Sequence, residues 1–345
     1  MECSKRDHGL VSVIVPVYQT PSDIVERQLR SILAQTYDNI EVILVEDGNA
    51  PSYCADLQGL CRMDPRIRLV SQRNGGPSKA RNRGLDESKG DFVVFADADD
   101  EVLPGFVSAG VSYLETYGLD AVYGRHISRF AQYDQIKTQE IGKEIEVFEG
   151  ADLDGLARYF FAHERPRDLR APRNVSCGPW GKVFRGDVAR SCRFDERMDM
   201  CEDAVFNSEV IAAAKRVGFV DDVWCIYYQN DGSIYHSLEF NGPFYEHYGI
   251  AAAHIEDRPG FNQALYAQML HRFICTMNNV VGKRGISATG DVRLALRNAE
   301  LATALSSIEV ELFDVGSSWR VLKALGRRRM ALLLVLAFML KRGRL

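Results

Sequence analysis

Residues 90–104 read Gly-Asp-Phe-Val-Val-Phe-Ala-Asp-Ala-Asp-Asp-Glu-Val-Leu-Pro, and they join a short apolar run to a group of acids. The run at residues 92–96 is entirely apolar, which is typical of a parallel strand that is buried on both faces. Four acids follow it within five residues, namely Asp97, Asp99, Asp100 and Glu101. Ligands of open α/β sheets collect outside the carboxyl ends of such strands. We therefore expect a binding site where this strand ends.

The spacing of Asp97 and Asp99 indicates a metal site. If the backbone stays extended, a two-residue spacing places both carboxylates on one side of the chain. Carboxylate oxygens suit Mg²⁺ or Mn²⁺, which proteins hold with one or two carboxylates plus the phosphates of a substrate. The alternative is a solvated acidic turn that ends the strand. We predict a divalent cation, Mn²⁺ or Mg²⁺, as the cofactor.

The residues before this turn alternate between strand and helix patterns. We expect strands at residues 11–16, 40–45 and 67–70. A helix is expected after the first strand, with Thr20 as its N-cap. Such alternation predicts βαβ units, whereas from about residue 241 the apolar residues recur at helical spacing. The predicted fold class is α/β: a Rossmann-like, mixed but mostly parallel sheet flanked by helices, with a C-terminal helical extension.

Four motifs occur in order along the first 110 residues, namely VSVIVPVY at 11–18, ILVEDG at 43–48, NGGPSKARNRG at 74–84 and DADD at 97–100. Together they resemble glycosyltransferase family 2, whose members have the GT-A fold, and in particular its bacterial surface-polysaccharide type. Four ordered motifs are far more specific than any one of them. The resemblance is dense over the first 110 residues and continues more thinly to about residue 240.

The resemblance implies a nucleotide-sugar donor, with UDP as the expected nucleotide. The residues that it implies for donor binding are Pro16, Tyr18, Glu46, Asp47, Asn74, Gly76, Arg81, Asp97 and Ala98. In relatives the acid at the position of Asp47 holds the uracil base, although from the residues alone Asp47 can equally cap a turn. The family usually has two aspartates followed by Gly-Ser, and this chain departs from that pattern at Glu46 and Asn49.

The glycines at residues 75 and 76 come directly before a predicted helix. Glycine permits backbone conformations that are closed to other residues, and it allows a ligand to approach closely. The helix that starts near Pro77 turns free N–H groups toward the same side, where a diphosphate can bind. The alternative is a plain turn before a solvated helix.

A second acid pair, Glu202 and Asp203, opens another predicted helix. These acids can simply complement the helix dipole. An inverting sugar transfer, however, needs a carboxylate that takes the proton of the acceptor hydroxyl. The family resemblance places such a base in an equivalent Glu-Asp motif, so we assign Asp203 as the base and Glu202 as the residue that orients it. His236 follows in a loop as a candidate third metal ligand, and its alternative is a surface histidine.

The charge and composition of the chain indicate its partners and its location in the cell. The net charge is −5, yet from Val315 onward there are eight Lys and Arg and no acid. The run of eleven apolar residues at 330–340 spans about 16 Å as a helix, against a hydrocarbon core of about 30 Å. It therefore either lies in a membrane interface or packs against this chain or a second copy. The eight cysteines show no disulfide or zinc spacing, and no signal peptide is apparent. We expect a cytoplasmic protein that contacts the inner face of the cell membrane through this tail.

The expected protein is a metal-dependent, inverting hexosyltransferase that moves a sugar from a UDP-sugar to a saccharide or lipid-linked hydroxyl acceptor in polysaccharide or glycolipid synthesis. We expect residues 1–240 to form the GT-A catalytic domain, with 1–110 binding the nucleotide-sugar and 111–240 supplying the acceptor side and the base. Residues 241–345 form the helical region with its basic, apolar tail. No nucleic acid partner is expected.

Two other classes stay open. A metal-dependent nucleotidyltransferase would carry a glycine-rich and basic phosphate loop after its first strand. Residues 16–20 stand at that place, and their sequence, Pro-Val-Tyr-Gln-Thr, offers no such loop. A non-catalytic nucleotide-sugar-binding module would not need both acid pairs.

Overall fold

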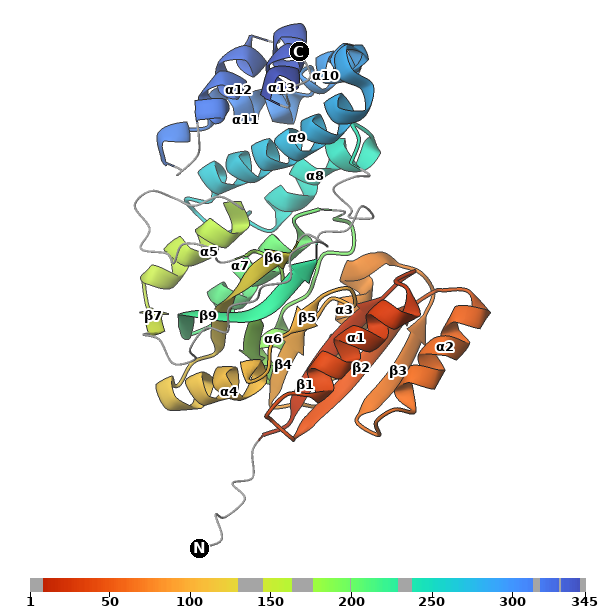
Figure 1. Ribbon diagram of the computed structural model, residues 1–345. Helices are drawn as coiled ribbons and strands as arrows, with labels where there is room; N and C mark the ends of the chain where they lie inside the picture. The colour runs from red at the N-terminus through yellow and green to blue at the C-terminus, as the bar shows by residue number, and fades with distance from the viewer. Residues whose placement is uncertain are drawn as a thin grey trace, which may run out of the picture. The chain divides into compact units, whose positions relative to one another are not determined.

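The computed structural model describes residues 9–129, 145–162, 176–198, 200–228, 238–312, 317–328 and 330–341 (Figure 1). The chain forms two compact units, which we call the sheet unit and the helical unit. The sheet unit comprises Met1–Asp154, Pro172–Glu196 and Glu209–Gln229, and the helical unit comprises Gly155–Ala171, Arg197–Ser208 and Asn230–Leu345. The boundary predicted at residue 240 separates catalytic residues from supporting ones. A division into compact units does not test this boundary, so it stays a prediction.

Within the described residues of the sheet unit, nine strands form one mixed sheet. They are β1 (Val11–Val17), β2 (Ile40–Asp47), β3 (Ile67–Gln72), β4 (Phe92–Phe95), β5 (Glu101–Val102), β6 (Ala121–Arg129), β7 (Ile145–Glu149), β8 (Lys182–Arg185) and β9 (Arg216–Tyr228). The order is β3-β2-β1-β4-β8-β6-β9-β5, and β7 pairs with β9. Strands β1 to β4 pair in parallel, whereas β8 is antiparallel to both of its neighbours. The carboxyl ends of β1, β2 and β4 therefore meet at one edge.

Apolar patterning explains why these elements pack as they do. Ile14 of β1 and Ile43 of β2 are fully buried, as expected for parallel strands that are covered on both faces. Val25, Leu29 and Ile32 are buried on one face of the first helix, at the spacing that places side chains on one side. The helices of this unit include α1 (Ser22–Leu33), α2 (Pro51–Cys61), α3 (Gly76–Glu87), α4 (Phe106–Tyr117) and α6 (Gly186–Ser191). The α/β fold prediction is confirmed.

The start of α1 differs from the prediction. The helix begins at Ser22 with Pro21 at the N-cap position, and no side chain caps it. The Thr20 hydroxyl instead donates to the carbonyl of Tyr18 (3.5 Å). The N-cap prediction for Thr20 was therefore wrong, because a threonine hydroxyl can bond within its own turn rather than to a helix.

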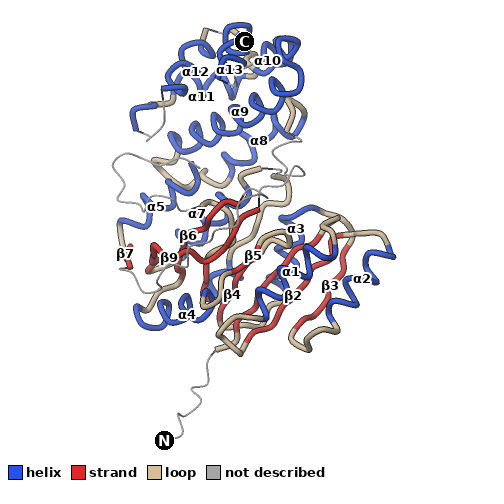
Figure 2. Tube along the Cα trace, viewed as in Figure 1, coloured by secondary structure: helices blue, strands red, loops and turns tan. Residues whose placement is uncertain are grey.

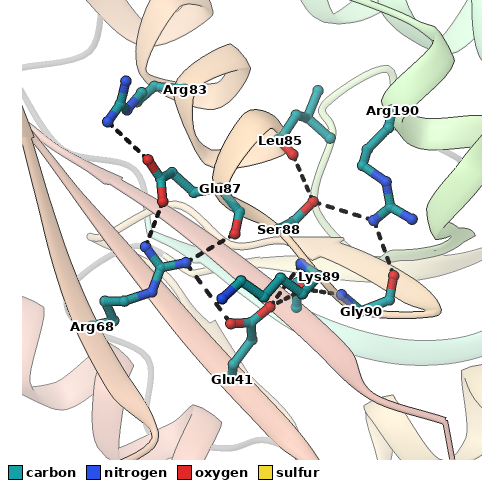
Figure 3. Close-up of polar contacts among 10 residues, drawn as sticks. Glu41, Arg68, Arg83, Leu85, Glu87, Ser88, Lys89, Gly90 and Arg190 are labelled. Carbon is teal, nitrogen blue, oxygen red and sulfur yellow. Dashed lines mark hydrogen bonds and ion pairs between the residues drawn. The ribbon is translucent and has the colours of Figure 1, made fainter.

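A polar network lies at the opposite edge of the sheet, where the strands begin (Figure 3). Arg68 of β3 lies 2.8 Å from Glu87 at the end of α3, and 3.9 Å from Glu41 of β2. Arg190 of α6 donates to the carbonyl of Gly90, just before β4 (3.0 Å). The network ties the amino ends of the strands to the helices, away from the edge where the predicted donor residues lie.

The helical unit is organised around α9 (Asn262–Arg284), which packs against α8, α11, α13 and η2 (Figure 2). The other elements beyond residue 240 are α8 (Gly242–Ala253), η2 (Gly285–Ala288), α10 (Thr289–Ala295), α11 (Ala299–Ser307), η3 (Val310–Leu312), α12 (Ser317–Arg327) and α13 (Ala331–Lys341). Earlier in the chain lie α5 (Asp152–Ala162) and α7 (Glu202–Ala213). Among the described residues, no helix has both the length and the apolar character that spanning a bilayer requires.

Candidate active site

Asp47, the last residue of β2, holds the glycine loop that follows β3. The carboxylate is buried, and one oxygen, Oδ1, accepts from Gln72 Nε2 (2.7 Å) and from the backbone N–H of Gly75 (2.9 Å). The other oxygen, Oδ2, accepts from Asn74 Nδ2 (3.2 Å) and from the backbone N–H of Gly76 (2.8 Å). The predicted residues Asp47, Asn74 and Gly76 therefore come together. Asp47 fixes the shape of the loop that opens α3.

Two glycines allow this arrangement. Gly48 has φ +77°, and a Cβ atom there would lie 2.3 Å from the backbone nitrogen of Asn74. No other residue fits such an approach, so the turn after β2 can lie directly against the loop. Gly76 has φ +85°, and the space around it is open. It turns the chain into the first turn of α3.

Glu46 and Asn49, the two departures from the family pattern, contact each other. Asn49 donates to Glu46 Oε1 from its side chain (2.8 Å) and also from its backbone N–H. Asn49 also bridges to the end of β1, because Nδ2 donates to the carbonyl of Val17 (3.2 Å) and Oδ1 accepts from the N–H of Gln19 (2.6 Å). Asn49 thus links the buried Glu46, at the carboxyl end of β2, to the carboxyl end of β1. Glu46 and Asn49, which stand where the family usually has Asp and Ser, therefore act as a pair.

Pro16 and Tyr18 lie at the carboxyl end of β1. Pro16 is inside the strand and faces Val45 of β2 in the parallel register. Tyr18 follows the strand with 47% of its surface exposed, and its hydroxyl accepts from Gln19 Nε2 (3.0 Å). Its ring is therefore an aromatic surface open to solvent at the edge where the strands end.

The acid turn after β4 is held by two helices. The buried Arg81 of α3 lies 3.0 Å from Asp97 Oδ1. From α1, Gln28 donates to the carbonyl of Asp97 (2.9 Å) and Arg27 donates to the carbonyl of Asp99 (2.7 Å). These contacts fix the turn's backbone. Arg81, which we expect to bind the donor, thus lies beside the acid turn, whereas no sequence pattern singled out Arg27 or Gln28.

Asp100 is the acid of this turn that sequence reasoning did not assign. It is buried next to Ala98, and its Oδ1 accepts from the backbone N–H of Tyr228 in β9 (3.0 Å). Its Oδ2 is buried and has no hydrogen-bond partner among the described residues. Burial first, and then the charges of Asp97 and Asp99, raise the pKa of this carboxyl to about 9. Burial and the neighbouring acids therefore favour the protonated form of Asp100.

An aromatic cluster stands beside the turn. Trp180 pairs with Phe95, the last residue of β4, through an isolated bridge, and it is almost fully buried. Tyr227 of β9 stacks on Trp180 with ring centroids 5.6 Å apart, and His126 meets Trp180 edge-on at 4.6 Å. Lys182 donates to the carbonyl of Trp180 (3.2 Å). These contacts give Trp180 a packing role in the wall of the site.

Glu202 and Asp203 are the first residues of α7 and belong to the helical unit. Asp203 Oδ1 accepts from the backbone N–H of Ala204 (2.7 Å), and Asn207 donates to the carbonyl of Asp203 (2.8 Å). The preceding Cys201 has φ +65°, and burial, followed by the charge of Asp203, raises the pKa of its thiol well above the ordinary value. The base assignment stays a prediction.

The metal assignment also stays a prediction. His236 lies outside the described residues. Within the part of the chain that the structure describes, no three His, Cys, Asp or Glu side chains converge as a complete metal cage. Magnesium and manganese sites, however, commonly use one or two carboxylates and complete their shell with substrate phosphates and water. Asp97 and Asp99, beside the partnerless Oδ2 of Asp100, supply hard oxygens of this kind.

Comparison with known proteins agrees with this geometry. Residues 12–188 match the family model described as Glycosyl transferase family 2, which is more than half of the chain. The chain belongs to glycosyl transferase family 2. The family predicted from the four motifs is thereby confirmed, and the chain is a glycosyltransferase.

Two curated relatives show where the likeness extends. The chain is 28% identical to the uncharacterized glycosyltransferase EpsJ of Bacillus subtilis (strain 168) over 268 residues, 72% of this chain and 73% of EpsJ. It is 26% identical to the succinoglycan biosynthesis protein ExoW of Rhizobium meliloti (strain 1021) over 246 residues, 68% of this chain and 73% of ExoW.

A solved structure supports the fold. The crystal structure of S. aureus TarS 1–349 superposes with a TM-score of 0.64 at 19% identity, covering 97% of this chain and 92% of that one. At this level of identity the likeness concerns the fold, and the predicted GT-A architecture is confirmed.

Proposed function

We propose that this glycosyltransferase moves a sugar, with inversion, from a nucleotide-sugar to a hydroxyl group of a saccharide or lipid-linked acceptor, in polysaccharide or glycolipid synthesis. We propose UDP as the nucleotide. The observation that carries the proposal is that one sheet edge holds both the loop fixed by Asp47 and the acid turn after β4. TarS has been solved with UDP and with UDP-GlcNAc, and ExoW is named for succinoglycan biosynthesis, which supports this choice of donor and acceptor class.

In this proposal the donor lies along the carboxyl ends of β1, β2 and β4. The first turn of α3 presents backbone N–H groups and a dipole that favour a diphosphate. Asp47 accepts four hydrogen bonds from its own chain, so it serves the donor by shaping the loop at Asn74 and Gly76. Tyr18 offers an exposed ring to the base or sugar.

We propose Mn²⁺ or Mg²⁺ as the cofactor. The residues present fit such an ion, because the acid turn gathers hard oxygen donors and includes the buried Oδ2 of Asp100, which has no hydrogen-bond partner among the described residues. Asp99 would hold the cation, with Asp97 and His236 as further candidates. A bound cation would offset negative charge on the leaving diphosphate.

We propose Asp203 as the general base and Glu202 as the residue that orients it. Asp203→Asn keeps the shape of the side chain but cannot take a proton from the acceptor. Turnover should fall about 100-fold or more, with UDP affinity unchanged, whereas Glu202→Gln should cost less. Near-normal turnover by a folded Asp203→Asn variant would remove the base assignment.

The proposed reaction is tested by product analysis on the full chain with a panel of UDP-sugars and Mn²⁺. Released UDP indicates glycosyl transfer or donor hydrolysis, and released pyrophosphate indicates nucleotidyl transfer. Binding of UDP-sugars without any product indicates a binding module. The proposal expects UDP, and either of the other two outcomes would overturn it.

We also propose that residues 1–240 carry the catalysis, with 1–110 binding the donor and 111–240 supplying the acceptor side, and that 241–345 support them. The location that we propose is the cytoplasm, at the inner face of the cell membrane.

A further inference from the structure

One outward surface of the helical unit combines apolar and basic side chains, and we propose that it docks on an anionic lipid surface. We call it the α10 surface and define it by Ile286, Arg293, Leu294 and Arg297. The inference goes beyond sugar transfer and does not depend on it. It also differs from the expected membrane contact of the C-terminal tail, since Ala331, Leu334 and Val335 in that tail are buried.

Helical periodicity places these residues on one face. The 3₁₀ turn η2 runs directly into α10, and exposed residues recur at Ile286, Gly290, Arg293, Leu294 and Arg297. Spacings of three and four residues bring side chains to the same side of a helix. Between them Ala288, Val292 and Ala295 are buried. The inner residues of this segment are packed, and the exposed ones form a stripe that runs from η2 through α10 to Arg297, in the turn that follows the helix.

The stripe is unusually apolar for a surface. Ile286 and Leu294 each expose 58% of their surface. Single exposed apolar residues are ordinary, but two within one short segment, beside exposed arginines, indicate an interaction site.

Charge selects the kind of partner. Residues 283–297 contain four Lys and Arg and a single acid, Asp291, and that acid pairs with Arg284 (2.9 Å). Among the described residues, no ion pair involves the exposed Arg293 or Arg297. The surface therefore carries a positive charge that anionic phospholipid headgroups complement.

Arginine and apolar side chains are direct neighbours on this surface, as Arg293 and Leu294 show. A lipid interface accepts both kinds of side chain, because headgroups meet the guanidinium groups while the acyl boundary takes up the isoleucine and leucine.

The test is sedimentation of the full chain with vesicles of phosphatidylcholine alone or mixed with phosphatidylglycerol. We expect binding only to the mixed vesicles, and we expect high salt to weaken it, because screening acts on exposed charges. Arg293→Gln with Arg297→Gln should lower the partition coefficient about tenfold or more. Ile286→Ser with Leu294→Ser should reduce the binding that survives high salt. Leu312→Ser, an equally simple change at an exposed leucine of η3, is the matched control and should bind like the wild type.

A second readout covers the case in which a double variant folds poorly. In Leu294→Trp, tryptophan emission should shift to shorter wavelength with the mixed vesicles, and in Leu312→Trp it should not. Equal binding to both vesicle types, unchanged binding of the arginine variant, or an equal emission shift in both tryptophan variants would overturn the proposal. Retention by soluble polyglutamate together with no vesicle binding would assign the surface to an acidic protein instead.

Discussion

Asp47 shows how a single carboxylate can organise a loop through hydrogen bonds within its own chain. Its two oxygens accept four hydrogen bonds, from Gln72, Asn74, Gly75 and Gly76. Two of the donors are backbone N–H groups that a turn made of glycines leaves without other partners. The loop therefore takes its shape from an acid about thirty residues earlier in the chain, and the start of α3 is aligned before any donor arrives.

Asp47→Asn should disturb this loop. An amide keeps one acceptor oxygen and replaces the other with N–H donors, which face the N–H groups of the loop. We expect a loss of about 1 to 3 kcal/mol in the free energy of unfolding. We also expect about tenfold weaker UDP binding, which corresponds to about 1.4 kcal/mol. Denaturant titration and calorimetry measure the two effects.

Arg68→Ala is the matched control for that variant. Arg68 belongs to the network at the far edge of the sheet (Figure 3), and its partly exposed ion pairs contribute about 1 kcal/mol or less. It should lower stability slightly and leave UDP affinity unchanged. If Arg68→Ala weakened UDP binding as much as Asp47→Asn, the loss would reflect general destabilisation, and the role given to Asp47 would be wrong.

Glu46 and Asn49 should behave as a coupled pair. Glu46→Asp shortens the side chain by one methylene and withdraws it from Asn49, and Asn49→Ser removes the amide that reaches Glu46 and Val17. The double variant restores the usual family pattern. We expect a coupling energy of about 0.5 to 3 kcal/mol in a double-mutant cycle on stability. Strict additivity of the two single changes would show that the contact carries no energy.

The sequence could predict which residues gather at this edge but not how they divide the work. Asp47, Asn74 and Gly76 stand in ordered motifs after successive strands, so their meeting follows from a parallel sheet. That both Asp47 oxygens are used within the chain depends on the path of the loop. No role could be predicted for Asp100, because nothing in the sequence distinguishes it from the acids beside it. Its burial against Tyr228, 128 residues away, sets it apart.

At the scale of elements, packing among β6, β8 and β9 buries His126 and favours its neutral form. The ring meets both Trp180 and Tyr227 edge-on, and its Nδ1 is buried without a hydrogen-bond partner among the described residues. Burial, and then the charges of Lys182 on β8 and Arg125 on the same strand, lower the pKa of His126 to about 4. Protonation would bury a charge beside two cations.

This shift predicts how stability depends on pH. Between pH 6.5 and about 4 the unfolded chain binds a proton at His126 that the folded chain does not, so the free energy of unfolding falls as pH falls. The slope cannot exceed about 1.4 kcal/mol per pH unit, because a single proton is bound. His126→Gln removes this titration. Denaturant titrations across the window should therefore give a flatter curve for the variant, and parallel curves would contradict the assignment.

Element boundaries were predicted correctly where apolar periodicity decides them. The start of α1 was predicted wrongly, because the hydroxyl at that point can form either of two hydrogen bonds. The strands at 11–16, 40–45 and 67–70 were placed to within two residues, since the first two are largely buried apolar runs and the third has buried Ile67 and Val70. Thr20 could cap α1 or bond to Tyr18, and only the fold chooses between them. The sequence likewise did not decide whether the apolar run at 330–340 lies in a membrane interface or packs against protein. In the structure, Leu334 and Val335 of α13 are buried.

At the scale of the whole molecule, the chain joins a mixed α/β unit to a helical unit, and the family's motifs lie in the first. The α/β class followed from the alternation of strand and helix patterns, and the family from the order of four motifs. The roles of the helices beyond residue 240 could not be predicted, because packing helices share a period and carry no motif. The α10 surface is an example: its pattern is visible only once burial shows which face is turned outward.

The central claim is that the carboxyl edge of β1, β2 and β4 binds a nucleotide diphosphate together with a divalent cation. Calorimetric titration of UDP into the wild type and into Asp99→Asn, each with and without Mn²⁺, tests it most directly. The account predicts that Mn²⁺ strengthens UDP binding to the wild type about tenfold or more, equivalent to about 1.4 kcal/mol, and has little effect on the variant. UDP affinity that is the same with and without Mn²⁺, and the same in both proteins, would contradict it.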